Sequence, residues 1–292
     1  MSNKPELYIP MNCVIGEGPV WDERDQTLYF IDLLGGKIYH KAETLEKLDV
    51  GETVGCIALR ERGGMIAGLK SGWYFMDFPS GKREFISWPE GDRTGSRFND
   101  GKADPAGRMW SGTMPTTLDT GEGEAGPDSA LYSLDQKLNV KQMASGIIQG
   151  NGMAWTADTK QFYFIDTQSR HVLGFDYDIG TNVLTNQRIA VTVPEKDAIP
   201  DGMTIDDEGR LWIALWGGSA VSVWNPRNGT LLEKIELPAK NVTSCCFGGA
   251  DMKDLFITTA SLGTDLERYP QAGSVFRLRT DVSGAKSFRF GG

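Results

Sequence analysis

Asp22-Glu-Arg-Asp-Gln-Thr-Leu-Tyr-Phe-Ile-Asp32, an acidic turn followed by a short aromatic and aliphatic strand, decides the fold because the chain repeats it. Successive copies are 37 to 53 residues apart, and long amphipathic helices are missing from the pattern. Strand repeats of this period indicate a β-propeller. The sequence therefore predicts an all-β fold, a six-bladed β-propeller that forms a single domain over residues 1–292. The strands of the six copies start at Leu28, Met65, Met109, Phe162, Leu211 and Leu255.

The two ends of the chain are expected to close the ring. A closed ring is needed because an open one leaves an unpaired strand edge. Residues 7–9 alternate suitably for the outer strand of the last blade, which ends with residues 273–278. The Gly-rich segment 116–128 is the longest turn-rich insertion, and we expect it to form a lid or rim on one face.

Composition excludes several classes of function. A formal net charge of -9 with scattered Lys and Arg disfavours nucleic-acid binding, which needs a basic patch. The start of the chain lacks an apolar leader, and no segment approaches the roughly 18 apolar residues of a membrane span. Cys13, Cys56, Cys245 and Cys246 lack C-x-x-C spacing and are expected to be buried reduced thiols. We therefore expect a cytoplasmic protein without membrane or nucleic-acid partners, either a monomer or a weak homo-oligomer.

A dense polar stretch, Arg97-Phe-Asn-Asp-Gly-Lys102, reads as a polar loop that feeds the buried strand of the third copy. An Asn-Asp-Gly run alone is an ordinary turn. Its position within the repeat is more informative. Counting back ten or eleven residues from the expected inner strand gives an oxygen-bearing side chain in four copies, and only Gly55 and Ser244 in the other two. The four residues are Glu17, Asn99, Asn151 and Asp201.

These four side chains should converge, because equivalent positions of propeller blades lie at the same depth near the central axis. Two carboxylates and two carboxamides are hard oxygen donors with a charge of -2, which suits one divalent metal ion at the axis. Calcium is the first choice, and manganese, magnesium, zinc or iron are alternatives. The two histidines, His40 and His171, fall in apparent outer strands, so a histidine-rich zinc site is not expected.

Other polar and aromatic residues are interpreted as structural. Asp100, Lys102 and Asp104 are expected to be turn and blade-packing residues. The chain has no G-x-S-x-G motif, so a Ser-His-Asp hydrolase is not supported. Three tryptophans follow the strand pattern and are expected in the core, with one of them a candidate for lining the cavity: Trp110, Trp155 and Trp212.

Six motifs occur in one order along the chain: Gly16-Glu-Gly-Pro-Val-Trp21, Arg97-Phe-Asn-Asp-Gly-Lys-Ala-Asp-Pro105, Ser111-Gly-Thr-Met114, Asn151-Gly-Met-Ala-Trp155, Phe175-Asp-Tyr-Asp178 and Pro200-Asp-Gly-Met-Thr-Ile-Asp206. Together they resemble the family of SMP-30 (regucalcin), gluconolactonases and luciferin-regenerating enzymes. The resemblance spans essentially the whole chain. The endings Leu211-Trp-Ile-Ala-Leu-Trp-Gly-Gly218 and Cys246-Phe-Gly-Gly-Ala-Asp251 are most similar to its bacterial sugar-lactonase branch.

The resemblance implies a metal-dependent hydrolase that opens sugar lactones. Glu17, Asn151 and Asp201 would bind the metal, and Asp201 would also act as general base. Arg97 and Asn99 would contact the substrate. Some animal members carry a carboxylate at the position of Thr117, so substrate contacts from that segment do not carry over.

Two other functions remain open. The alternative from another class is a non-catalytic, calcium-binding regulatory propeller, which would use the same metal site. A phosphotriester or luciferin-related substrate fits the polar segment 117–128 less well, because such a ligand needs a more apolar lid.

Overall fold

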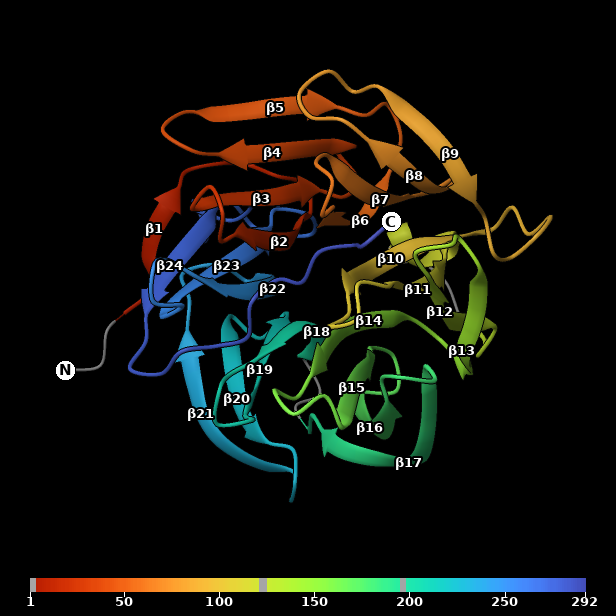
Figure 1. Ribbon diagram of the computed structural model, residues 1–292. Helices are drawn as coiled ribbons and strands as arrows, with labels where there is room; N and C mark the ends of the chain where they lie inside the picture. The colour runs from red at the N-terminus through yellow and green to blue at the C-terminus, as the bar shows by residue number, and fades with distance from the viewer. Residues whose placement is uncertain (1–3, 121–124, 195–197) are drawn as a thin grey trace.

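A computed structural model describes residues 4–120, 125–194 and 198–292. Within them, six four-stranded antiparallel sheets are arranged as a ring around a central axis (Figure 1). The predicted all-β, six-bladed β-propeller is therefore confirmed.

Each sheet is one blade, and the strands of a blade follow one another along the chain from the axis outward. The first three blades consist of β2 (Gly16–Asp22), β3 (Thr27–Asp32), β4 (Lys37–Lys41) and β5 (Leu45–Asp49); β6 (Val54–Leu59), β7 (Met65–Leu69), β8 (Gly72–Met76) and β9 (Arg83–Ser87); and β10 (Ser96–Ala103), β11 (Met109–Pro115), β12 (Ser129–Leu134) and β13 (Val140–Ile147). A short 3-10 helix, η1 (Thr116–Thr120), follows β11.

The next two blades keep the same order, and the sixth takes its outer strand from the start of the chain. These blades consist of β14 (Gly150–Trp155), β15 (Gln161–Asp166), β16 (His171–Asp178) and β17 (Val183–Thr192); β18 (Ile199–Ile205), β19 (Leu211–Trp216), β20 (Ala220–Asn225) and β21 (Thr230–Glu236); and β22 (Asn241–Gly248), β23 (Asp254–Ala260), β24 (Val275–Arg279) and β1 (Glu6–Ile9).

The ring closes as the sequence predicted, by pairing of the first strand with the last. β1 runs antiparallel to β24, with Glu6 opposite Arg277 and Leu7 opposite Phe276. The Arg277 guanidinium donates through Nε to Glu6 Oε1 over 2.9 Å, which adds an ion pair to the backbone ladder.

The strand of the sequence repeat is the second strand of each blade, and its interpretation as the innermost strand was wrong. Each copy has its own strand closer to the axis, and the supposed polar loop 97–102 lies within one of these, β10. The reason is composition: the innermost strands are rich in Gly and polar residues, which have low strand propensity and resemble turns. Packing between two neighbouring blades overrides that preference.

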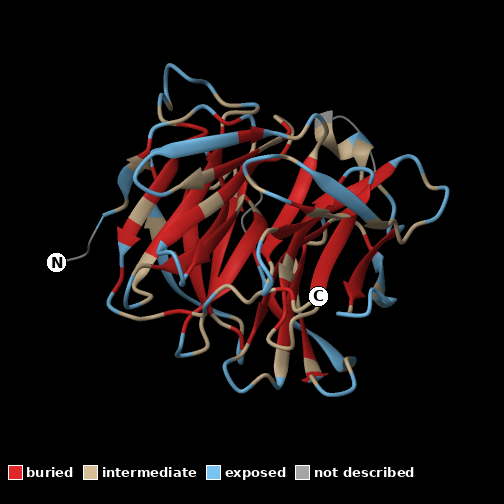
Figure 2. Ribbon diagram, turned by 45° about the horizontal axis from the view of Figure 1, so that its top comes forward, coloured by how far each residue is buried: buried red, intermediate tan, exposed pale blue. Residues whose placement is uncertain are grey.

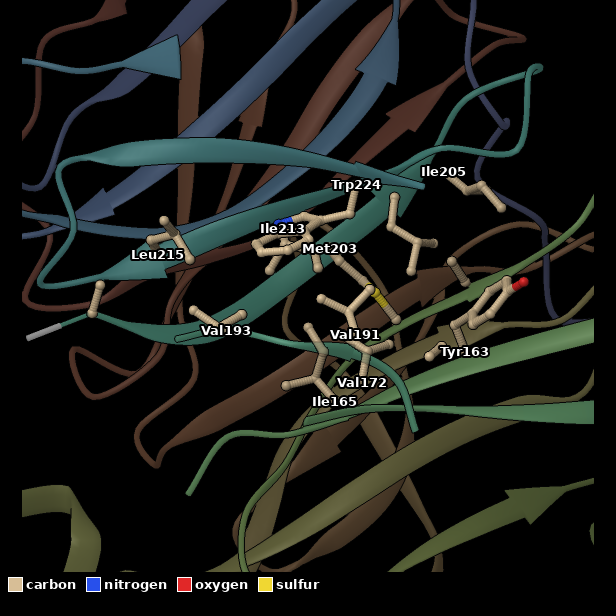
Figure 3. Packing of buried hydrophobic residues seen from close by; sticks show 14 of the residues in the cluster. Tyr163, Ile165, Val172, Val191, Val193, Met203, Ile205, Ile213, Leu215 and Trp224 are labelled. Carbon is tan, nitrogen blue, oxygen red and sulfur yellow. The ribbon is translucent and has the colours of Figure 1, made fainter. Parts of the chain in front are cut away.

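The core consists of apolar clusters between adjacent blades. One of them joins β15, β16 and β17 to β18, β19 and β20, with Ile165, Val172 and Val191 facing Met203 and Ile213 (Figure 3). Inner strands are buried, whereas the outermost strands β5, β9, β13, β17 and β21 have exposed faces (Figure 2). The predicted core positions Trp110, Trp155 and Trp212 are at most 5% exposed.

After β24 the chain runs back across the propeller as a C-terminal tail. Gly284 bridges to Asp206, and Phe290, fully buried, bridges to Arg60 (Figure 1). The Trp21 backbone N–H donates to Ser287 Oγ on the way. The tail therefore ties blades 1, 2 and 5 together.

Two further expectations concern cysteines and membranes. All four cysteines are free and buried, as predicted. Burial raises the pKa of the Cys245 thiol to about 12, so this group is no nucleophile at neutral pH. Among the described residues, no helix has the length and apolarity needed to cross a membrane.

Candidate metal centre

The polar residues found by the repeat count lie on the innermost strands, where each strand carries a β-bulge. The register with the second strand shifts between Glu17 and Val20 in β2, and between equivalent positions in β10, β14 and β18. A bulge inserts an extra residue and turns a side chain out of the regular alternation. Four blades thus present an oxygen-bearing side chain at one level of the axis: Glu17, Asn99, Asn151 and Asp201.

Glycines beside these residues allow the strands to meet at the axis. A Cβ on Gly152 would lie 2.5 Å from the backbone nitrogen of Met203, and a Cβ on Gly202 would lie 2.1 Å from Ser244 Oγ. No side chain fits at either position without moving its neighbour. The Gly that follows Asn151 and the Gly that follows Asp201 are therefore requirements of the crowded axis, not signs of a turn.

Asn151 and Asp201 contact each other directly. Asn151 Nδ2 donates to Asp201 Oδ1 over 2.6 Å and to Thr167 Oγ1 over 2.9 Å, and the Thr167 hydroxyl donates to the carbonyl of Pro200. These contacts fix the amide so that its nitrogen faces Asp201. Among the described residues nothing donates to Asn151 Oδ1, which leaves this oxygen available as a ligand.

Arg97 and Asn99 form a second pair on β10. Arg97 Nη1 donates to Asn99 Oδ1 over 3.0 Å, and Asn99 Nδ2 donates to the carbonyl of Gly150 over 2.9 Å. Arg97 is 2% exposed, and its other edge binds Asp119 of η1. The structure thus brings the two predicted substrate residues together and adds a carboxylate to them.

Three carboxyl groups are buried around the axis: Glu17, Asp100 and Asp201. Burial raises the pKa of Glu17 well above its usual range, and the charges of Asp201 and Asp100 raise it further. Burial also raises the pKa of Asp201 to about 8, against the hydrogen bond from Asn151. Burial raises the pKa of Asp100 as well, although Lys102 opposes the shift.

The cluster of Glu17, Asp100 and Asp201 has fewer positive than negative groups around it. Glu17 accepts one hydrogen bond, from the Gly18 backbone N–H, and Asp100 Oδ2 is buried without a partner. Lys102 donates to the carbonyl of Met203 and forms no ion pair within the described part of the chain. With all three carboxyls ionised, their charge of -3 against the one ammonium of Lys102 would leave two negative charges uncompensated.

The donor set and the missing charge both fit one divalent cation. Among the described residues, no three His, Cys, Asp and Glu side chains are arranged to hold a metal by themselves. The amide of Asn151 is therefore needed, beside Glu17 and Asp201, for a set of three protein ligands.

A cavity of about 570 Å³ opens onto the site at one end of the inner strands. Glu17, Arg97, Asn99 and Asp201 line it, whereas Asn151 lies beneath the surface and is 1% exposed. η1 contributes Leu118 and Asp119 to the rim, in the segment 116–128 that the sequence assigned to a lid or rim. Residues 121–124 of that segment lie outside the described residues.

The interpretation of Asp100 and Lys102 as turn residues was wrong, because both belong to β10. They line a separate chamber of about 50 Å³ on the axis, beyond the bulge. Asp104 does have the predicted packing role, since its carboxylate accepts from the Trp110 indole over 3.1 Å and from the Arg108 backbone N–H over 2.8 Å.

Four residues of the site were missed by sequence reasoning: Asp100, Asp119, Thr167 and Trp216. Asp100 directly follows Asn99 in the motif Arg97-Phe-Asn-Asp-Gly-Lys102, and this adjacency was the available signal. Thr167 directly follows β15 and Trp216 ends β19; nothing in the sequence sets either residue apart, yet both line the cavity.

The sequence model of the family described as "SMP-30/Gluconolactonase/LRE-like region" matches residues 15–261. Regucalcin of Danio rerio is 37% identical over 284 residues, which cover 95% of this chain and 94% of that protein.

Solved structures agree with the fold. A luciferin-regenerating enzyme is 30% identical and superposes with a TM-score of 0.91, covering 98% of this chain and 99% of that one. A calcium-binding protein, regucalcin, from Agrobacterium tumefaciens has the same TM-score of 0.91 at 23% identity, with 99% and 97% covered.

Proposed function

The chain belongs to the SMP-30/gluconolactonase/LRE-like family, and from this premise we propose that it is a metal-dependent lactonase that hydrolyses sugar lactones to sugar acids. The observation that carries the proposal is the pair of Glu17 and Asp201 on the cavity lining, with Asn151 buried directly behind Asp201 and with Arg97 and Asn99 also on the lining. A carboxylate set that lacks positive charge, next to donors for hydroxyl groups, suits ester hydrolysis of a polyhydroxylated ring.

Glu17, Asn151 and Asp201 would hold the divalent ion, through carboxylate oxygens and Asn151 Oδ1. When bound, such an ion supplies Lewis-acid polarisation of the lactone carbonyl. Calcium is our first choice, in keeping with the calcium-binding regucalcin of Agrobacterium tumefaciens.

Asp201 would accept a proton from the attacking water. The water oxygen bonds to the carbonyl carbon, the ring C–O bond breaks, and the proton passes from Asp201 to the departing ring oxygen, which gives a hydroxy acid. Asn151 Nδ2 holds Asp201 Oδ1 over 2.6 Å and so orients the carboxylate for this exchange.

Arg97 and Asn99 would place the sugar ring. Four of the five N–H groups of Arg97 are already engaged, by Phe98, Asn99 and Asp119. The remaining N–H, on Nη2, has no partner within the described residues and can donate to one substrate oxygen.

The test is a panel of aldonolactones, scored by acid release after chelation and reloading with one metal at a time. We expect turnover by the wild type and a loss of at least about a hundredfold in Asp201→Asn at saturating metal. Asp128→Asn, an exposed acid outside the cavity, is the matched control. Full activity of Asp201→Asn would disprove the assignment of the base.

The second candidate is a non-catalytic calcium-binding regulator, which the name regucalcin of the relatives favours. Both candidates bind metal at the same residues, so turnover separates them. If no lactone in the panel is hydrolysed with Ca²⁺, Mn²⁺ or Zn²⁺, the regulatory function is the better description.

A further inference from the structure

Asp119 holds the substrate-facing arginine from the rim of the cavity. Its Oδ1 accepts from Arg97 Nε over 2.9 Å and from Nη2 over 2.5 Å. The Asp119 side chain is 19% exposed, whereas that of Arg97 is 3% exposed. A rim carboxylate thus covers the outer edge of a buried guanidinium.

The edge that Asp119 occupies is the one that an anionic ligand would use. A free carboxylate binds arginine best through two parallel N–H groups. Nε and Nη2 of Arg97 already donate to Asp119, and Nη1 donates to the carbonyl of Phe98 and to Asn99 Oδ1. One N–H on Nη2 is left, which suits a single hydroxyl or carbonyl oxygen of a neutral molecule.

The other charges on the cavity wall do not alter this preference. Glu17 and Asp201 are committed to the cation that the site fits, and Lys240 is exposed at the rim, where Nζ donates to the carbonyl of Gly263 over 3.3 Å. Beside Arg97, Asp119 is the closest countercharge.

We propose that Asp119 is a positioning and specificity-determining residue: by occupying the Nε and Nη2 edge of Arg97, it favours a neutral lactone over anionic ligands, including the acid that hydrolysis produces. The inference rests on the proposed function for the identity of these ligands. It explains how a site that contains an arginine and a cation avoids retaining a carboxylate product.

The probe is gluconate, titrated calorimetrically into calcium-loaded protein at low ionic strength. In Asp119→Asn, the gluconate Kd should fall by about tenfold, because the neutral amide no longer competes for the guanidinium with a full charge. This gain in gluconate affinity should be smaller at high salt, where charges are screened. Asp119→Ser removes the same charge with a smaller side chain and should give the same result.

Two controls separate this effect from a merely structural one. Asp119→Glu keeps the charge and should bind gluconate as the wild type does, and Asp128→Asn removes an acid from the same connection without touching Arg97. In the kinetic arm, gluconate should become a stronger competitive inhibitor of Asp119→Asn, while the KM of a neutral lactone changes much less.

The possible results test the role of Asp119 and the lactonase activity separately. If the wild type hydrolyses lactones but gluconate binds Asp119→Asn no more tightly, the role of Asp119 is refuted and the lactonase stands. If no lactone is hydrolysed, the lactonase fails, and the calorimetric comparison still decides whether Asp119 selects against anions.

Discussion

Removal of the metal should make the stability of this protein fall as the pH rises, and Asp201 should be the main cause. Burial raises the pKa of this carboxyl from 3.8 to about 8. A carboxyl whose pKa is raised by folding holds its proton more tightly in the folded state. The folded state therefore loses stability between about pH 4 and pH 8, where the unfolded chain is already ionised.

The size of the effect follows from the shift. A difference of about four pKa units corresponds to at most about 6 kcal/mol. Relaxation of the protein and entry of water into the cavity reduce this penalty. We therefore expect the metal-free protein to lose about 2–3 kcal/mol of folding free energy. For a protein of this size that is roughly 5–10 °C in Tm.

The assay compares thermal unfolding of chelator-treated wild type and Asp201→Asn at pH 5 and pH 8. The asparagine keeps an acceptor for Asn151 Nδ2 but carries no charge. We expect the metal-free variant to be the more stable protein at pH 8, and the difference to narrow at pH 5. Addition of calcium should restore the thermal stability of the wild type, but it should not raise that of Asp201→Asn. If the difference in Tm between the two metal-free proteins is the same at pH 5 and pH 8, the argument that ionised Asp201 destabilises the metal-free protein is refuted.

Two further predictions concern the ligands and the crowded axis. Glu17→Gln should lower calcium affinity at least about tenfold in a calorimetric titration, because a buried carboxylate ligand is lost; an unchanged affinity would remove Glu17 from the metal site. Gly202→Ala should destabilise the protein by about 1–3 kcal/mol in urea unfolding, since its Cβ would lie 2.1 Å from Ser244 Oγ. Gly95→Ala, where nothing lies within 4 Å of the added Cβ, should be close to neutral; equal effects of the two would contradict the crowding.

The fold could be predicted because its signal is local and repeated. An Asp/Gly-rich turn followed by a short aromatic or aliphatic strand marks the second strand of every blade, and residues 7–9 carry their own alternation. The innermost strands could not be recognised in the same way. β10 reads as a turn because it contains Asn99, Asp100 and Gly101, and only the close packing of neighbouring blades keeps it extended.

The candidate site could be predicted only as far as the repeat extends. Equivalent blade positions gave Glu17, Asn99, Asn151 and Asp201. Asp119 comes from η1 between β11 and β12, and within the described residues the equivalent connections of the other blades contain no such helix. Thr167, just after β15, accepts from Asn151 of β14 and donates to Pro200 of β18, a link that no spacing in the sequence records.

The pairing of β1 with β24 sets the order in which the molecule can be completed. Glu6 and Arg277 are 271 residues apart, so β1 needs a partner that is made much later in synthesis. At about 5–20 residues per second, roughly 15–60 s pass before that partner exists. Until β24 has been made, β1 has no strand to pair with in its own blade. Closure of the ring is therefore a late event, and a newly made chain carries an open strand edge until it happens.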